Sequence, residues 1–206
     1  DLGDGTTATV DAVVLAGGVA SSAALLAGPA PAATSALSEV PLATSTVVSL
    51  AYPADAFGKP LETHGWLEAD PAPISGVTVS SAKWAGRAPE GTVLIRAFVP
   101  ERLGEIARAG DEVLTARIGA HLAEVIGVRG EPLLTRIARW PAMMPTYTVG
   151  HPARVTAAEE GLAGLPAWRI AGSALRGVGV PDCVADGRRQ AALALDHAGS
   201  RARVAP

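Results

Sequence analysis

The sequence has little cysteine, few aromatic side chains and almost no lysine. Of its 206 residues one is cysteine, 4% are aromatic, and the net charge is −3. A single cysteine, Cys183, excludes an intrachain disulfide and a cysteine-cluster zinc site. The four histidines form no HxxxH or HExxH pair, so we expect no bound metal. The balance of charge is not basic, and we expect no nucleic-acid partner.

A long hydrophobic run is also absent. The most apolar stretch, residues 10–27, is interrupted by Gly17, Gly18 and two serines, whereas a membrane span needs about 20 apolar residues. Acidic residues precede this stretch where a signal peptide would be basic. We therefore expect no membrane span, no signal peptide and a cytoplasmic protein. With 49% hydrophobic and 18% charged residues, the chain is typical of a folded globular protein.

The apolar pattern predicts a strand, a glycine turn and a helix at 10–16, 17–18 and 19–27. Residues 34–39 predict a short helix, and the next segments predict strands at 45–51, 64–69, 76–81 and 92–99. Several strands in a row without helices between them indicate an antiparallel sheet. An amphipathic helix at 111–126 follows, and then a strand at 132–140, a helix at 156–163, a strand at 167–171 and a helix at 181–198. The fold class is mixed α/β.

Residues 168–192, WRIAGSALRGVGVPDCVADGRRQAA, carry the clearest chemical pattern. A strand ends at Gly172, Gly177 and Gly179 permit unusual backbone conformations, and Pro181 suits a first helical residue. The unpaired amides and the positive end of the helix dipole could hold a phosphate or the electron-rich edge of a reduced flavin ring. We assign Asp182 to structure. A glycine-rich connection that binds nothing remains the alternative.

Four segments resemble one family. AGSALRGVGVPDCVADGRRQA (171–191) resembles the flavin-binding signature AGNxxxGVGxPDCIxSG of the protoporphyrinogen and coproporphyrinogen oxidases, which belong to the flavin-dependent amine oxidase superfamily. RWPAMMPTYTVGH (139–151) resembles RWxxAMPQYxVGH, and SSAKWAGRAPEGTVLIRAFV (80–99) resembles SSKWPxRAPEGxxLLRAFV. VVSLAYPADAFGKPL (47–61) resembles the strand and turn before them. The sequence departs from the family pattern at the following positions: Gly17-Gly18, Thr146, Ser173 and Asp186.

The resemblance implies the C-terminal part of a two-domain, amine-oxidase-like fold. Residues 1–28 and 149–206 would be strand and helix segments of a Rossmann-like FAD domain, and residues 29–148 a sheet-rich substrate-binding domain. The family's N-terminal GxGxxG unit is not in this sequence, so the N-terminal half of the same enzyme is an expected partner.

The resemblance also implies an activity. The intact enzyme would be an FAD-dependent oxidoreductase of haem biosynthesis that converts a porphyrinogen to a porphyrin with molecular oxygen as acceptor. The composition favours the soluble bacterial type acting on coproporphyrinogen III, with protoporphyrinogen IX as the alternative substrate. We expect the chain alone to be inactive, and a homo-oligomer is compatible with it. A non-catalytic αβ interaction domain that has lost the cofactor, or another amine-oxidase-type flavoenzyme, remains open.

By resemblance, FAD would contact the backbone of the glycine loop and one aromatic side chain: Gly172, Ser173, Gly177, Val178, Gly179, Val180 and Trp140. The porphyrinogen would contact Tyr147, Met143 and Arg96, the last through a propionate. Arg136, Arg139 and Arg176 are further candidates for the propionates. For each of these side chains, ordinary packing or a surface ion pair remains the alternative. No catalytic residue is assigned.

Overall fold

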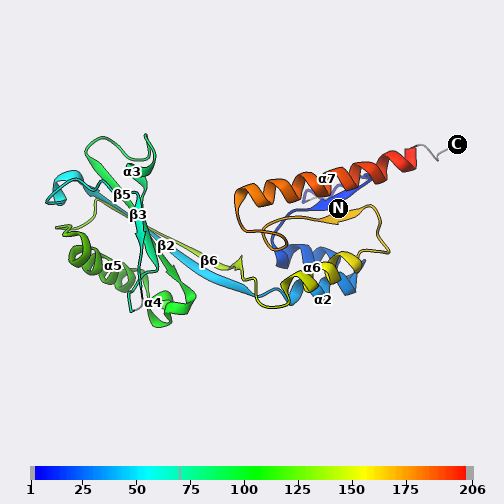
Figure 1. Ribbon diagram of the computed structural model, residues 1–206, viewed down its shortest axis with the longest axis horizontal. Helices are drawn as coiled ribbons and strands as arrows, with labels where there is room; N and C mark the ends of the chain where they lie inside the picture. Colours follow the sequence, from blue (N-terminus) through cyan, green and yellow to red (C-terminus); the bar gives the residue numbers. More distant parts are fainter. Residues whose placement is uncertain (1–2, 70, 203–206) are drawn as a thin grey trace. The chain divides into compact units, whose positions relative to one another are not determined.

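The computed structural model describes residues 3–69 and 71–202, and the chain divides into two compact units. The first unit joins Asp1–Leu42 to Pro145–Pro206, and the second is Ala43–Met144. Elements of the first unit are β1 (Val13–Leu15), α1 (Val19–Leu26), α2 (Pro31–Ser38), α6 (His151–Glu160), β7 (Trp168–Ile170) and α7 (Val180–Ala202). Figure 1 shows their order along the chain.

The second unit contains the longer strands. Its strands are β2 (Leu42–Pro53), β3 (Gly65–Leu67), β4 (Gly76–Val79), β5 (Thr92–Pro100) and β6 (Leu134–Pro145). The first residue of β2 and the last residue of β6 belong to the first unit. Its helices are η1 (Ala54–Ala56), α3 (Ser80–Lys83), η2 (Glu101–Leu103), α4 (Glu105–Arg108) and α5 (Asp111–Ile126).

The five strands form one sheet in the order β3-β4-β5-β2-β6. Strand β5 runs antiparallel to β2 and to β4, and β3 runs antiparallel to β4. The antiparallel sheet expected for the middle of the chain is therefore confirmed.

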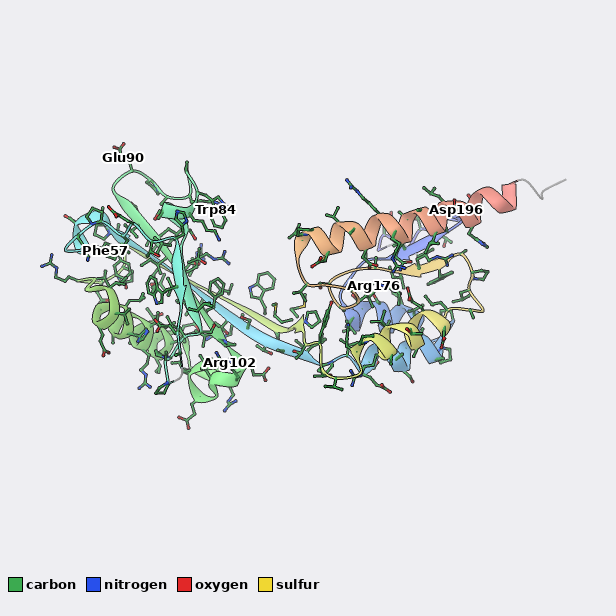
Figure 2. The ribbon with its side chains drawn as sticks, viewed as in Figure 1. Phe57, Trp84, Glu90, Arg102, Arg176 and Asp196 are labelled. Atoms are coloured by element: carbon green, nitrogen blue, oxygen red, sulfur yellow. The ribbon has the colours of Figure 1, made fainter. Side chains whose placement is uncertain are left out.

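Helix α5 covers one face of this sheet. Its buried residues Leu114, Ile118 and Leu122 recur every fourth position and so share one side of the helix. They pack on inward-facing residues of the central strands, such as Leu50 and Ile95. Phe57, labelled in Figure 2, belongs to the same core.

The first unit is built around a short parallel pair of strands. Strand β1 pairs with β7, with Val13 opposite Trp168 and Leu15 opposite Ile170. Helices α1, α2 and α6 bury small apolar residues in one core with Ile170 of β7 and Leu175 of the following loop. The helices approach closely: a Cβ added at Gly161 would lie 2.4 Å from the amide nitrogen of Ala33.

The edges of the two units differ from the predicted domain boundaries at 28/29 and 148/149. Helix α2 lies within the segment predicted as sheet-rich, yet its residues Ala33, Ala36 and Leu37 are buried in the core of the first unit. Alanine-rich sequence near prolines carries little periodic signal, so only packing assigns this helix to a unit.

Two predicted elements differ from the structure by about five residues at one end. The helix predicted at 156–163 begins at His151, where Gly150 (φ 87°) turns the chain and Pro152 suits the first helical turn. The strand predicted to end at Trp140 continues to Pro145. Its final segment contains Ala142, whose φ is 49° and whose amide donates to the Thr44 hydroxyl (3.2 Å).

Candidate functional site

Two glycine-containing turns meet at one end of the first unit. Because β1 and β7 are parallel, the turns after them lie at the same edge of the pair. A Cβ added at Gly172 would lie 3.8 Å from the carbonyl oxygen of Ala16 and 3.9 Å from that of Gly17. Helix α1 begins just after the first turn and α7 just after the second. Two helix N-termini, with their unpaired amides and positive dipole ends, therefore belong to this edge.

The loop from Gly172 to Gly179, called the glycine loop below, needs glycine at particular positions. Gly172 has φ 126° and Gly177 has φ 144°, values that side chains with a Cβ rarely adopt. A Cβ at Gly177 would lie 2.4 Å from Cβ of Asp182, and one at Gly179 would lie 2.8 Å from its Oδ2. The side chain of Asp182 thus fills the space beside the loop, and the loop tolerates no bulk there.

Cys183 contacts the same loop. Its amide donates to the carbonyl oxygen of Gly179 (3.0 Å), and its Sγ lies 3.6 Å from that of Gly177. The thiol is half-buried, and these contacts are those of a packing residue at the start of α7.

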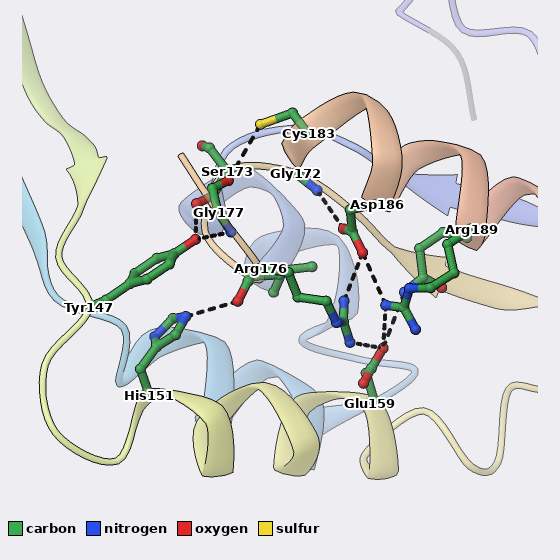
Figure 3. A network of polar contacts seen from close by, with 12 residues as sticks. Tyr147, His151, Glu159, Gly172, Ser173, Arg176, Gly177, Cys183, Asp186 and Arg189 are labelled. Atoms are coloured by element: carbon green, nitrogen blue, oxygen red, sulfur yellow. Dashed lines mark hydrogen bonds and ion pairs between the residues drawn. The ribbon is translucent and has the colours of Figure 1, made fainter. Parts of the chain in front are cut away.

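Tyr147 reaches the glycine loop through its hydroxyl group. The hydroxyl donates to the carbonyl oxygen of Ser173 (2.6 Å) and accepts from the amide of Gly177 (2.7 Å). Its ring stacks on His151 at 3.9 Å between centroids, with 13° between the planes. His151 is buried, and its Nε2 is 3.0 Å from the carbonyl oxygen of Leu175. Figure 3 shows both rings beside the loop.

On the α7 side, a group of charged side chains contacts the loop. The side chain of Asp186 is only 3% exposed. Its Oδ2 accepts from the amide of Gly172 (3.3 Å), while its Oδ1 accepts from Arg176 (2.9 Å) and Arg189 (3.0 Å). Glu159 of α6 pairs with both guanidinium groups and accepts from Gln190. Two carboxylates and two guanidinium groups balance in charge (Figure 3).

Sequence reasoning missed this network, apart from noting Asp186 as a departure from the family pattern. The spacing of residues along α7 did contain a signal for this network. Asp186, Gln190 and Ala194 are spaced by four residues and form the buried side of α7. Polar residues in a buried stripe must find partners, which predicts a network but not its members.

Of the predicted site residues, the glycine-loop residues and Tyr147 come together in the first unit. Val178 and Val180 are exposed. The amide of Gly172 donates to Asp186, and the amide of Gly177 donates to Tyr147. The other three, Trp140, Met143 and Arg96, belong to the second unit. Trp140 and Met143 are exposed on β6.

Arg96 lies on the sheet face opposite α5. It is paired in register with Ser49 and Thr78, between two core residues of β5 that point the other way. Its guanidinium carbon is 5.5 Å from the centroid of the Phe98 ring, which places a cation beside an aromatic surface on this face. Two of the other arginine candidates are engaged elsewhere: Arg139 pairs with Asp111 (2.5 Å), and Arg176 is held in the network above.

A cavity of the second unit does not coincide with these residues. It has a volume of about 890 Å³ and lies between α5 and the start of β6. Its charged lining residues are Asp111, Glu112, Glu131 and Arg136. Carboxylates predominate, so the cavity does not suit an anionic ligand.

Within residues 3–69 and 71–202, no cluster of three or more His, Cys, Asp or Glu side chains could hold a metal ion. In the same part of the chain, no helix is long and apolar enough to cross a membrane.

Comparison with known proteins agrees with this geometry. The model of the flavin-containing amine oxidoreductase family matches residues 1–195. A coproporphyrinogen III oxidase of Propionibacterium freudenreichii is 52% identical over 198 residues, which cover 96% of this chain and 38% of that protein. The coproporphyrinogen III oxidase of Bacillus subtilis is 35% identical over 126 residues, covering 60% of this chain and 27% of that protein.

Solved structures show the same fold. A protein from Exiguobacterium sp. 255-15, described as a protoporphyrinogen oxidase, superposes with a TM-score of 0.73 at 29% identity, over 91% of this chain and 42% of that one. A putrescine oxidase variant superposes with a TM-score of 0.65 at 17% identity, over 90% of this chain and 42% of that one, and shows the fold alone. The chain thus spans less than half the length of these relatives. The resemblance found in the sequence is confirmed, and the chain belongs to the flavin-containing amine oxidoreductase family.

Proposed function

We propose that the edge formed by the Gly17-Gly18 turn, the glycine loop and the start of α7 contributes to an FAD site. The observation that carries this proposal is the pairing of two glycine turns, each followed by a helix N-terminus, at the carboxyl edge of β1 and β7. In open α/β sheets this edge is where ligands bind, and helix N-termini favour anionic groups.

The residues present fit such a ligand. Gly177 and Gly179 let the backbone pass close to the start of α7, where the Asp182 side chain occupies the space that a Cβ at either position would need. Val178 and Val180 are exposed beside these glycines, which provides apolar contact for a flat ring. The carboxylate of Asp186 is neutralised by its arginines, so it does not oppose an electron-rich ring. A bound flavin would take electrons from the substrate and pass them to molecular oxygen, while the N-terminus of α7 would stabilise negative charge on the reduced ring.

For the substrate, we propose coproporphyrinogen III, oxidised to coproporphyrin III in haem biosynthesis. The relative that is 52% identical over 96% of this chain carries that activity in its name. Arg96 and Phe98 would offer a propionate contact and an aromatic surface on one sheet face, and Trp140 and Met143 would offer apolar contact on β6. Because the chain is shorter than its relatives, the activity is proposed for the longer polypeptide that contains it.

The test is oxidation of porphyrinogens by that full-length polypeptide, purified and assayed for bound FAD by absorbance. We expect porphyrin fluorescence to develop with oxygen uptake, and faster with coproporphyrinogen III than with protoporphyrinogen IX. Replacement of Arg96 by Gln should raise KM for coproporphyrinogen III about tenfold, the loss of roughly 1.4 kcal/mol.

Arg87→Gln is the matched control, because Arg87 is exposed and its guanidinium carbon lies 5.4 Å from the centroid of the Trp84 ring. Bound FAD without porphyrin formation from either substrate would refute the oxidase proposal. Faster turnover of protoporphyrinogen IX would refute the choice of substrate. Equal effects of the two arginine replacements would refute the role of Arg96.

A further inference from the structure

We propose that Asp186 and Tyr147 are positioning residues that hold the glycine loop from two sides in the shape that receives the flavin. The inference rests on the proposed FAD site, and it assigns to Tyr147 a contact with the loop in addition to the substrate contact predicted from the sequence. Neither side chain is required to touch the flavin itself.

The first contact that holds the glycine loop is made by the charged side chain of Asp186. The amide of Ala171 still belongs to the strand pair, since it donates to the carbonyl oxygen of Leu15 (2.9 Å). The next amide, that of Gly172, instead donates to the carboxylate of Asp186 on α7. The chain therefore leaves the sheet at the point where Asp186 binds it.

This carboxylate is fixed in place. It is almost completely buried, and a buried charge is stable only with compensating partners. Arg176 and Arg189 supply them, and Glu159 of α6 binds both arginines. Because Arg176 lies in the loop and Arg189 lies on α7, the ion pairs of the network connect the loop to both α6 and α7.

The second contact that holds the glycine loop is made by the hydroxyl group of Tyr147. It bridges the carbonyl oxygen of Ser173 and the amide of Gly177, two groups that are four residues apart in the loop. Within the loop, the amide of Leu175 also donates to the carbonyl oxygen of Gly172 (3.1 Å).

His151 supports the contact that Tyr147 makes with the loop. It stacks on the Tyr147 ring, and its Nε2 contacts the carbonyl oxygen of Leu175. The Tyr147 hydroxyl and the His151 imidazole together contact backbone groups of loop residues 173, 175 and 177. These contacts fix every second residue in this part of the loop.

A loop with several glycines needs such holds. Glycine allows many backbone conformations, and ordering each residue costs conformational entropy. A loop that is already ordered before the ligand arrives avoids this cost during binding, which raises affinity. We therefore expect the two holds to act on flavin affinity and on protection of the loop amides, without contributing to the chemical step.

The experiment uses the full-length polypeptide that carries this chain, with Asp186→Asn and Tyr147→Phe. The first variant removes the charge at nearly constant volume. The second removes only the hydroxyl and keeps the ring on His151, so the fold should be retained. The control is Arg188→Gln, since Arg188 is exposed on α7 next to Arg189 and no contact of it is found among the described residues.

Two quantities are measured. Hydrogen exchange of peptides spanning 171–179 is followed in the flavin-free protein, and the FAD dissociation constant is obtained by fluorescence titration. We expect each variant to exchange about tenfold faster at the loop and to bind FAD about tenfold more weakly. The control should match the wild type in both measurements.

The outcomes separate the two proposals. Unchanged exchange in both variants would show that the loop is held by other contacts, and it would overturn the inference. Faster exchange with unchanged FAD affinity would overturn the positioning role while leaving the FAD site standing. A wild-type protein with protected loop amides that takes up no FAD would overturn the proposed function, and with it the inference.

Discussion

At the scale of single residues, two glycines near the candidate site differ sharply in what they permit. Gly177 has a positive φ and no room for a Cβ beside Asp182, whereas a Cβ at Gly187 on α7 would meet nothing within 4 Å. The sequence shows glycine at both positions, but only the backbone conformation shows which of the two is required.

Replacement of Gly177 by Ala should therefore destabilise the protein, and replacement of Gly187 by Ala should stabilise it. Strain at the positive φ costs roughly 1–3 kcal/mol, to which the overlap with Asp182 adds. Within a helix, Ala is favoured over Gly by roughly 0.5–1 kcal/mol. The free energy of unfolding in urea measures both effects. Changes of the same sign in the two variants would contradict this account of the loop.

The sequence identified the glycines of this loop through their spacing, but it could not identify their contacts. Tyr147, for example, stands 30 residues from Gly177, and its role in the predicted site was assigned by resemblance alone. Its hydroxyl contacts follow from the path of the chain between β6 and α6, which no local pattern encodes.

At the scale of elements, one polar contact joins the edge strand β3 to helix α5. Nε1 of Trp66 donates to Oε1 of Glu68 (2.6 Å), and Nε2 of His121 lies 3.0 Å from the same oxygen. The hydrogen bond from Trp66 lowers the pKa of Glu68 below its usual value, with a smaller contribution from His121 against the opposing effect of burial.

This lowered pKa predicts a pH-dependent stability. The stabilisation is fully present above the unfolded-state pKa, about 4.3, and it is lost as the pH falls through the lower folded-state value. In thermal unfolding, Glu68→Gln should lower the Tm at pH 7, and the gap to the wild type should close below about pH 4. Glu90→Gln is the control, because Glu90 points outward from an exposed loop (Figure 2). A gap that is constant from pH 7 to pH 3 would argue against this role of the Glu68 carboxylate.

The elements themselves were largely predictable. Helix α5 has the predicted bounds, 111–126, because its apolar stripe has a clear helical period and Gly127 adopts the left-handed conformation that ends it. The unit to which α2 belongs and the extension of β6 to Pro145 were harder to predict. An alanine-rich helix has little amphipathic signal, and Pro141 suggests the end of a strand although it lies within one.

At the scale of the whole molecule, helix α7 leaves an apolar stripe uncovered. Val180 is 78% exposed and Leu195 is 71% exposed, and Val184 lies on the same side between them. These residues lie on a different side of α7 from the buried stripe of Asp186, Gln190 and Ala194. Uncovered apolar stripes of this kind promote association.

We predict that the 206-residue chain self-associates through this stripe when it is produced alone. The double replacement Val184→Asp and Leu195→Asp should shift the sedimentation coefficient towards that of a monomer. Ala192→Asp is the control, since it adds an acidic residue at an exposed position of the same helix without removing a large apolar side chain. A monomeric wild-type chain would contradict the prediction.

The order of the longer elements, the glycine loop before α7 and membership of the flavin family could be predicted from the sequence, because they depend on local periodicity and on contiguous motifs. The pairing of β1 with β7, the packing of α2 in the first unit, and the contacts of Tyr147 and Asp186 with the same loop are visible only in the folded chain. These features are contacts between residues distant in the chain. They depend on how the backbone closes on itself and on which buried polar groups find partners, and neither can be read from a segment in isolation.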